Sequence, residues 1–230
     1  MIVVTGATGH LGRLVIDGLL KKIPASEIVA AVRTPEKARD LAERGVQVRE
    51  ADYRQPNTLI TAFQGAAKLL LISGTEVGQR EVQHNSVIDA AKDAGIGFVA
   101  YTSLLHADTS PVELAVEHLA TERYLRKSGL AFSLLRNGWY FENQTAAIAS
   151  AGENGALIGA SGDGRYAAAT RAEYAAAAVA VLTGEGHCRC VFLNAPFAEG
   201  NAMEHCDGWE APPRLSMQAR HGNVARLPRK

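Results

Sequence analysis

The N-terminal stretch MIVVTGATGHLG constrains the fold more than any other part of the chain, because it joins an apolar strand to a helix through a glycine turn. Residues 2–4 form an unbroken apolar run, which is typical of a buried parallel strand. Gly6, Gly9 and Gly12 follow with the spacing G-x-x-G-x-x-G. Such glycines let the main chain approach a pyrophosphate, and the N-terminus of the next helix presents free N–H groups to the anion. A purely structural turn is the alternative, but the flanking strand and helix favour dinucleotide binding.

Apolar runs of strand length alternate with helical periodicity over the first 136 residues. Strands are predicted at residues 2–4, 28–32, 46–50, 68–72, 98–102 and 131–135, and helices at residues 11–22, 35–44, 56–63, 80–94 and 111–127. No hairpin dipeptide separates these segments. The pattern predicts an α/β fold with a doubly wound parallel sheet of the Rossmann type.

The C-terminal part departs from this alternation. The pattern loosens over residues 137–165, where glycines mark loops from which we expect a small substrate lobe to grow, and an alanine-rich helix is predicted at residues 170–183. Beyond His187 no period is sustained, so we expect at most one strand, near residues 191–193, and poor order after it. The chain is therefore expected to divide into a Rossmann domain at 1–136, the substrate lobe with the late helix packed on it at 137–187, and a divergent tail at 188–230.

Charge and apolar patterning indicate which partners to expect. Lys plus Arg equals Asp plus Glu at 24 each, so no global field draws the chain to nucleic acid or an anionic membrane. No apolar run approaches the roughly 20 residues of a membrane span, and the N-terminus is a strand rather than a signal segment. We expect a soluble, cytoplasmic protein whose partners are small molecules, and a homodimer is left open.

Cysteine and histidine gather near the C-terminus without forming a recognisable metal motif. Cys188, Cys190 and Cys206 all lie in the tail, so the main body has none with which to form disulfides, in agreement with a reducing compartment. With His187 and His205 they are ligand types that zinc accepts, but the C-x-x-C spacing is absent. We predict no metal site.

The residue after the second strand indicates which dinucleotide is bound. Ligands of open α/β sheets lie outside the carboxyl ends of the strands, and an NAD site usually has an acidic residue there to hold the ribose hydroxyls. This chain has Arg33 instead. A guanidinium pairs with a 2′-phosphate in bidentate geometry, so Arg33 predicts NADP(H) rather than NAD(H). The alternative is a solvated arginine at a strand end.

Other strand ends carry further polar groups. In chain order these are Asp52 and Tyr53; Ser73, Gly74 and Thr75; Thr102 and Ser103; and Asn137, Gly138, Trp139 and Tyr140. The first pair suits either adenine or an ordinary turn, whereas the glycine of the second group favours close approach of ribose and phosphates. The hydroxyls of the third pair either face the nicotinamide or cap a turn. Asn137 is a candidate to bond cofactor or substrate, and the aromatics beside it either wall a flat pocket or belong to the core.

Proton donors are harder to assign. Many glycine-turn dehydrogenases use a Tyr with a Lys four residues later, but none of the six tyrosines here has that partner. His118 and Glu122 stand one turn apart on the predicted fifth helix, either as a proton relay or, as we favour, as a solvated surface pair. His106, in the loop after the fifth strand, is a second candidate.

Several longer segments identify a family. GATGHLG, VRTPEKA, ADY, KLLLISGTEVGQR, YTSLLHADTSP and LLRNGWYFEN together closely resemble the NmrA-like atypical short-chain dehydrogenases. Within them the chain is most similar to the bacterial type 2 NAD(P)H:quinone oxidoreductases, relatives of triphenylmethane reductase. The resemblance covers about residues 1–187 and ends at the CRCVFLNAPFAEG segment, where family members continue into a lobe that helps to close the substrate pocket. We therefore expect a truncated or frame-shifted terminus that keeps the cofactor half and alters substrate closure.

The resemblance implies NADPH-dependent reduction of quinones in the cytoplasm, without flavin and without a Tyr/Lys pair. The cofactor contacts that it implies are Gly6, Ala7, Thr8, Gly9, His10, Leu11, Arg33, Ser73, Gly74, Thr75, Asn137, Gly138, Trp139, Tyr140, Phe141, Glu142 and Arg171. A quinone accepts hydride readily, so the leading hypothesis is direct transfer from the nicotinamide. The rival is a non-catalytic NADP(H) redox sensor that acts through a protein partner. A sugar-nucleotide epimerase would need the missing Tyr/Lys pair.

Overall fold

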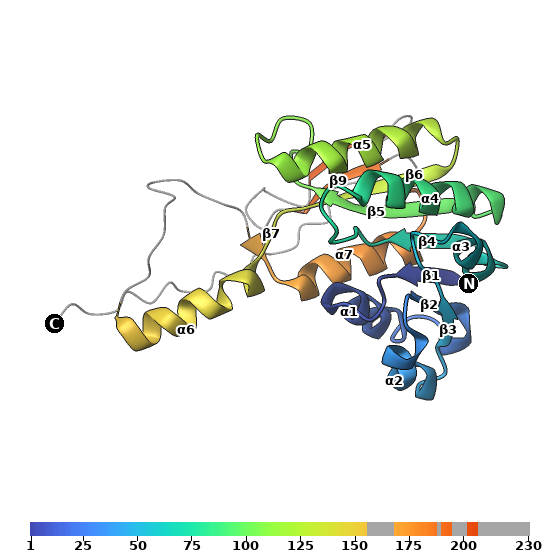
Figure 1. Cartoon of the computed structure of the whole chain (residues 1–230), viewed down its shortest axis with the longest axis horizontal. Helices are drawn as coiled ribbons and strands as arrows, with labels where there is room; N and C mark the ends of the chain where they lie inside the picture. The colour runs from blue at the N-terminus through green and yellow to red at the C-terminus, as the bar shows by residue number, and fades with distance from the viewer. Residues whose placement is uncertain (156–167, 188–189, 195–201, 207–230) are drawn as a thin grey trace.

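A computed structural model describes residues 1–155, 168–187, 190–194 and 202–206 of the chain (Figure 1). Its main sheet has the strand order β10-β9-β6-β5-β4-β1-β2-β3. These strands are β1 (Ile2–Thr5), β2 (Ile28–Val32), β3 (Gln47–Glu50), β4 (Lys68–Leu71), β5 (Phe98–Leu104), β6 (Ala131–Asn137), β9 (Cys190–Asn194) and β10 (Ala202–Cys206). All pair in parallel except β10, which is antiparallel to β9. The predicted doubly wound parallel sheet is confirmed, and its order reverses between β1 and β4.

Helices cover both faces of this sheet (Figure 1). They are α1 (His10–Leu19), α2 (Arg39–Glu43), α3 (Pro56–Phe63), α4 (Arg80–Asp93), α5 (Glu113–Lys127) and α7 (Arg171–Thr183), with 3-10 turns η1 (Ala25–Glu27), η2 (Pro35–Ala38) and η3 (Phe141–Gln144). A further helix, α6 (Thr145–Asn154), extends away from the sheet (Figure 1). A second sheet pairs β7 (Trp139–Tyr140) with β8 (Ala168–Ala169). No helix in the described ranges has both the length and the apolar content needed to cross a membrane.

The central strand β1 supplies both halves of the core, because successive strand residues point to opposite faces. Val4 packs in the cluster formed by α1 and α7, whereas Val3 packs in the cluster formed by α3, α4 and α5. All four residues of β1 are buried. The unbroken apolar run of the sequence is thus explained by burial on both faces.

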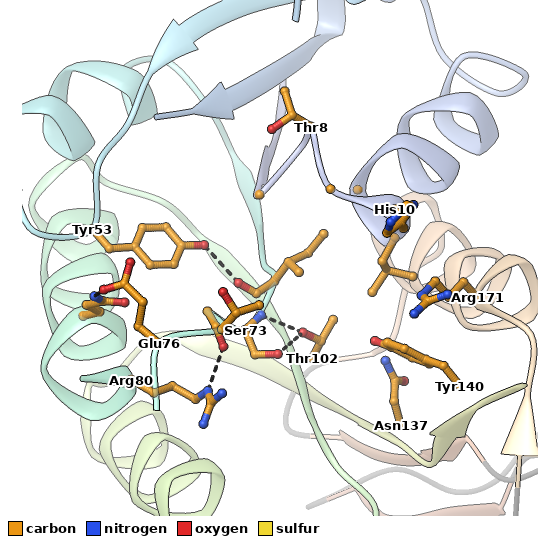
Figure 2. A pocket seen from close by; sticks show the side chains of 18 of the residues that line it. Thr8, His10, Tyr53, Ser73, Glu76, Arg80, Thr102, Asn137, Tyr140 and Arg171 are labelled. Carbon is orange, nitrogen blue, oxygen red and sulfur yellow. Dashed lines mark hydrogen bonds between the residues drawn. The ribbon is translucent and has the colours of Figure 1, made fainter. Parts of the chain in front are cut away.

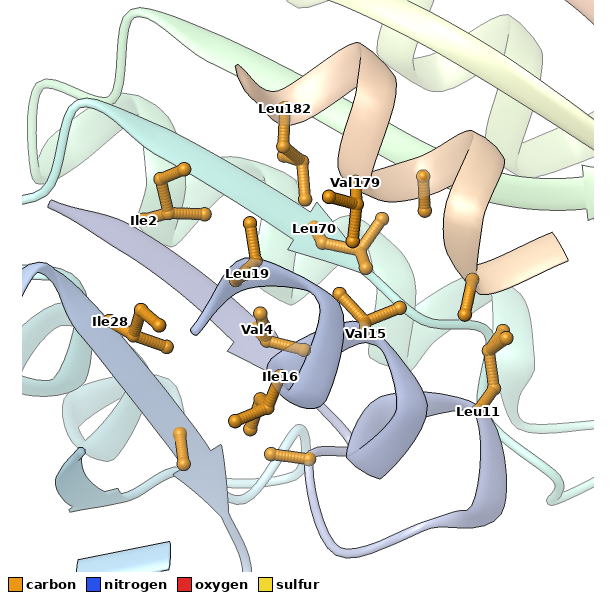
Figure 3. Packing of buried hydrophobic residues seen from close by; sticks show 14 of the residues in the cluster. Ile2, Val4, Leu11, Val15, Ile16, Leu19, Ile28, Leu70, Val179 and Leu182 are labelled. Atoms are coloured by element: carbon orange, nitrogen blue, oxygen red, sulfur yellow. The ribbon is translucent and has the colours of Figure 1, made fainter. Parts of the chain in front are cut away.

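The late helix α7 packs on α1 (Figure 3). Gly18 of α1 makes this approach possible, since a Cβ there would lie 2.8 Å from Val179 Cγ2. Thr170 caps α7 in a reciprocal capping box with Glu173. The C-terminal helix is therefore joined to the opening β-α unit, with its N-terminus beside the strand ends that carry the site.

One prediction about the C-terminal region is wrong. At most one strand was expected beyond His187, whereas β9 and β10 both extend the sheet, with β9 pairing along β6 from Ser133 to Asn137. Strand β9, an apolar run, pairs with the backbone N–H and C=O groups at the edge of β6. The segment that forms β10 has no apolar periodicity, so the sequence does not predict this strand. Positions 188–189, 195–201 and 207–230 of the predicted tail lie outside the described residues.

Candidate functional site

A cleft of about 750 Å³ crosses the carboxyl ends of the central strands (Figure 2). Its walls come from the loops after strands β1 to β6, from α4 and α5, and from the N-terminus of α7. The cleft therefore occupies the place where the strand order reverses, at which open α/β sheets bind their ligands. We call the part around Gly6 and Arg33 the dinucleotide end, and the part around His118 and Asn137 the substrate end.

The glycine turn at the dinucleotide end is built by close backbone contacts. Gly6 has a φ of +59°, a conformation that favours glycine, and its carbonyl accepts from Gly9 N at 2.9 Å. A Cβ on Gly12 would lie 2.4 Å from Gly6 O and 2.7 Å from Ala7 Cα, so only glycine fits. Gly9 is the N-cap of α1 and has no side chain to cap it, and no acidic residue occupies the first turn. The N–H groups of this helix terminus remain available to an anion.

Tyr53 forms one wall of the dinucleotide end (Figure 2). Its hydroxyl donates to Thr5 Oγ1 at 2.6 Å, and Thr5 Oγ1 also accepts from Ile72 N at 3.0 Å. Desolvation raises the pKa of Tyr53, so the phenol stays neutral. Asp52 lines the cleft too, but its carboxylate caps a turn by accepting from Arg54 N, and bonds from the Arg54 side chain lower its pKa to about 2.

Arg33 stands at the edge of the dinucleotide end with 60% of its side chain exposed. Its Nη1 donates to Glu76 Oε1 at 3.0 Å, and Glu76 Oε2 accepts from Gln83 Nε2 at 2.7 Å. Thr34 and Lys37 line the cleft beside it. Arg33 is thus placed to bind an anionic group of a ligand in place of the Glu76 carboxylate.

The loop after β4 is held from behind by buried side chains. Ser73 N donates to Thr102 Oγ1 at 2.9 Å, and Gly74 N donates to His84 Nε2 at 2.9 Å. Arg80 Nε donates to Gly74 O at 2.9 Å (Figure 2). Burial lowers the pKa of His84 to about 3, so this histidine is a neutral acceptor. The predicted segment from Ser73 to Thr75 lines the cleft with its backbone fixed.

The interpretation of His118 and Glu122 as a solvated pair is wrong, since both side chains are buried on α5. His118 lines the substrate end, and its Nδ1 lies 2.7 Å from the Tyr101 hydroxyl. Glu122 accepts from Ser103 Oγ at 2.5 Å and pairs with Arg136 Nη2 at 2.8 Å. Partners on β5 and β6 make burial of these polar groups possible, and the sequence spacing on one helix does not reveal them.

Burial, followed by the charge of Arg80, lowers the pKa of His118 to about 4. The imidazole is therefore neutral at pH 7. The other ring nitrogen, Nε2, makes no hydrogen bond within the described part of the chain. It is accessible to solvent, because it is not one of the buried polar atoms that lack a partner there. With His118 lining the cleft, this nitrogen is available at the substrate end.

The segment after β6 meets the N-terminus of α7. Asn137, Gly138, Trp139, Tyr140 and Arg171 line the cleft. The Arg171 guanidinium lies 4.8 Å from the centre of the Tyr140 ring, a cation–π contact that joins the two elements. Trp139 is 51% exposed, so the core alternative is wrong for this aromatic.

Of the other predicted contacts, Thr8, Gly9, His10 and Leu11 also line the cleft, whereas Ala7, Phe141 and Glu142 fall outside it. His106, the other candidate proton donor, falls outside it too. Ala7 is buried within the glycine turn, and Phe141 is half exposed outside the cleft. Glu142 caps α7 by accepting from Arg171 N at 2.8 Å. His106 shapes the turn after β5 with a φ of +54°.

Some residues of the cleft were missed at the level of sequence. These are Ala31, Val32, Thr34, Lys37, Ala51, Ile72, Glu76, Val77, Arg80, Gln83, Leu104, Leu114 and Asn143. Arg80 and Gln83 stand three positions apart on α4, and this helical spacing is a usable indication that both face the same loop. The remaining positions have no local pattern, because their place depends on the packing of distant elements.

A parallel sheet whose order reverses beside a glycine turn, with a cleft across its strand ends, defines the class of dinucleotide-binding proteins. The chain belongs to the NAD(P)H-binding family, whose model matches residues 6–185. It is 59% identical over 187 residues to quinone oxidoreductase 2 of Escherichia coli K12, which covers 81% of this chain and 65% of that protein. The chain thus spans slightly less than two thirds of the length of this relative.

Solved structures give the same result. An NADPH-dependent quinone oxidoreductase of Escherichia coli, complexed with NADPH, superposes with a TM-score of 0.83 at 57% identity, over 85% of this chain and 69% of that one. The Citrobacter triphenylmethane reductase complexed with NADP(H) has a TM-score of 0.82 at 46% identity, over 84% and 69% of the two chains. The resemblance inferred from the sequence motifs is therefore confirmed.

Proposed function

We propose that this protein is an NADPH-dependent quinone reductase that transfers hydride directly, without flavin. The observation that carries the proposal is the cleft that runs from the glycine turn to the substrate end, in a chain 59% identical over 187 residues to a quinone oxidoreductase. The sensor hypothesis is not favoured, because this similarity is to an enzyme. The Escherichia coli quinone oxidoreductase structure is complexed with NADPH, and NADPH is proposed here on that basis together with Arg33.

The residues present fit such a cofactor. The close backbone contact at Gly12 and the uncapped N-terminus of α1 suit a pyrophosphate, while Arg33 suits a 2′-phosphate. Thr102, near the end of β5, and Asn137, the last residue of β6, are placed to border the nicotinamide. When bound, NADPH supplies the hydride, and the chain needs only to hold two flat rings near reacting distance.

His118 is proposed as the group that meets the reduced quinone oxygen. Donation from the Tyr101 hydroxyl to Nδ1 would leave the proton of the neutral imidazole on Nε2, which is available at the substrate end. Addition of hydride to a quinone leaves an oxyanion that takes up one proton. His118 would stabilise this oxyanion by a hydrogen bond, and the proton would come from water, because the lowered pKa keeps the imidazolium form scarce at pH 7.

The organisation of the chain is also part of the proposal. Residues 1–136 would hold the dinucleotide, and residues 137–187 would form the substrate lobe with α7. The described strands from the 188–230 segment join the main sheet rather than a separate unit. A cytoplasmic location with small-molecule partners is proposed from the proposed activity. Cys190 is disulfide-bonded, so the cysteines do not support the expected reducing compartment. A homodimer is left open.

The test is to mix the purified, flavin-free protein with NADPH and benzoquinone and to follow the nicotinamide absorbance at ~340 nm. Protein-dependent loss of absorbance that requires both compounds is expected. Binding of NADP(H) without its consumption would favour the sensor hypothesis and contradict the proposal.

A further inference from the structure

We infer that Glu76 is a specificity-determining residue of the cofactor site, where it is the counter-ion of Arg33 and competes with a 2′-phosphate. The inference rests on the proposed use of NADP(H). Sequence reasoning assigned only Arg33 to this discrimination, whereas the structure pairs its guanidinium with a carboxylate from a distant loop. The strength with which the site prefers a 2′-phosphate would then depend on both residues.

The pair bridges two strand ends across the glycine turn. Arg33 follows β2 and Glu76 follows β4, and these two strands flank β1 in the sheet. Both side chains line the cleft. An adenosine ribose that reaches Arg33 therefore meets the Glu76 carboxylate as well.

Glu76 is held in this position from behind. Its Oε1 accepts from Arg33 at 3.0 Å, while its Oε2 accepts from Gln83 Nε2 at 2.7 Å. Gln83 is only 6% exposed on α4, so its amide is a fixed donor. The carboxylate thus stays near the cleft when an anion takes its place on Arg33.

Charge and exposure indicate the direction of the effect. The two side chains are 60% and 39% exposed, and ion pairs of that exposure contribute little to stability, whereas an arginine–phosphate pair is stronger. A 2′-phosphate would displace Glu76 and then face its negative charge at close range. A ribose with a free 2′-hydroxyl would instead find an acceptor in the same carboxylate.

A second cationic side chain, that of Arg54, also interacts with the charge of Glu76. The pKa of Arg54 is raised by its bond to Asp52 and, to a smaller degree, by the charge of Glu76. Removal of the Glu76 charge would therefore leave two guanidinium groups, Arg33 and Arg54, with less local compensation. Both consequences favour a 2′-phosphate over a 2′-hydroxyl.

The experiment compares adenosine 2′,5′-bisphosphate with adenosine 5′-monophosphate by calorimetry, since the two probes differ only in the 2′-phosphate. Glu76→Gln should bind the bisphosphate about 5-fold more tightly, or about 1 kcal/mol, and the monophosphate no more tightly. Glu36→Gln is the matched control, because this exposed glutamate three residues from Arg33 does not line the cleft. It should leave the ratio of the two dissociation constants unchanged.

A double variant tests whether Glu76 acts through Arg33. If it does, adding Glu76→Gln to Arg33→Ala should recover little of the preference for the bisphosphate over the monophosphate. An unchanged ratio in Glu76→Gln, or the same change in Glu36→Gln, would overturn the inference alone. Failure of the wild-type protein and Glu76→Gln to bind the bisphosphate would overturn both the inference and the proposed role of Arg33.

Discussion

The two ends of the cleft differ in whether main chain or side chains form most of their surface. At the dinucleotide end the surface is mostly backbone, formed by the glycine turn and the N-terminus of α1. At the substrate end the lining side chains of His118 and Ser103 are held by buried polar groups behind them, since His118 bonds Tyr101 and Ser103 donates to Glu122. Glu122 in turn pairs with Arg136. The first end depends on local sequence, and the second on contacts between elements far apart in the chain.

This difference teaches which changes each end tolerates. A backbone cradle fails when a side chain intrudes, because no rotamer change can make room. A buried polar network fails when a partner is removed or its charge changes, since desolvated groups lose their compensation. Variants chosen on this basis should damage one end and spare the other.

The largest effect is expected from Gly12→Val. Its Cβ would lie 2.4 Å from Gly6 O, and neither backbone segment can move without opening the turn. We expect NADPH binding to be lost, with destabilisation of about 2–4 kcal/mol. Calorimetric titration with NADPH and urea unfolding measure the two effects.

Gly152→Ala is the matched control, because a Cβ at this position in α6 would meet nothing within 4 Å. It should leave NADPH binding unchanged and alter stability by less than about 1 kcal/mol. Equal NADPH affinity in Gly12→Val and the wild-type protein would show that the glycine turn does not hold the cofactor.

The next effect concerns pH and the buried histidines. His84 and His118 have pKa values lowered from 6.5 to about 3 and about 4, so between these values and pH 6.5 the unfolded chain binds more protons than the folded one. The free energy of unfolding should therefore fall as pH drops below 6.5, by up to about 1.4 kcal/mol per pH unit for each group. Urea unfolding between pH 7.5 and pH 4.5 measures this. His118→Gln should flatten part of the slope, and a slope unchanged in that variant would contradict the assigned burial.

Arg33→Ala tests the dinucleotide end at its polar edge. Loss of charge-assisted bonds to a 2′-phosphate should weaken NADPH binding by about 1.5–3 kcal/mol. Binding of NADH should be spared, because its ribose lacks that group. Equal losses for both cofactors, measured by fluorescence titration, would refute the proposed role of Arg33.

The smallest effect is expected at His118. His118→Phe keeps a flat ring but removes the hydrogen-bond donor, so kcat with benzoquinone should fall by about tenfold or more while the KM for NADPH changes little. His118→Gln restores a donor and should recover part of the rate. His106→Phe is the control, because His106 lies outside the cleft. An unchanged kcat in His118→Phe would remove this histidine from the mechanism.

The same contrast explains what the sequence could predict. The six strands from β1 to β6 and the glycine turn follow from apolar runs and glycine spacing, which are local properties. Arg33 and Asn137 could be placed at the cleft because they directly follow or end a strand. The family motifs extended these predictions to Arg171, whose place at the N-terminus of α7 no local pattern specifies.

The substrate end could not be predicted in this way. His118 and Glu122 look like a surface pair on a helix, and only the arrival of Tyr101, Ser103 and Arg136 from β5 and β6 buries them. The bridge from Glu76 to Arg33 likewise joins loops 43 positions apart. Such partnerships depend on tertiary packing, for which a single sequence has no periodic pattern.

The most direct test of the two-ended cleft is a crystal structure of the protein with NADPH. The account predicts the 2′-phosphate within ~3 Å of the Arg33 guanidinium, the pyrophosphate at the N-terminus of α1, and the nicotinamide near Thr102 and Asn137. Space for a flat ring should then remain beside His118. A nicotinamide at the Arg33 end, or a cofactor bound outside the cleft, would contradict the central claim.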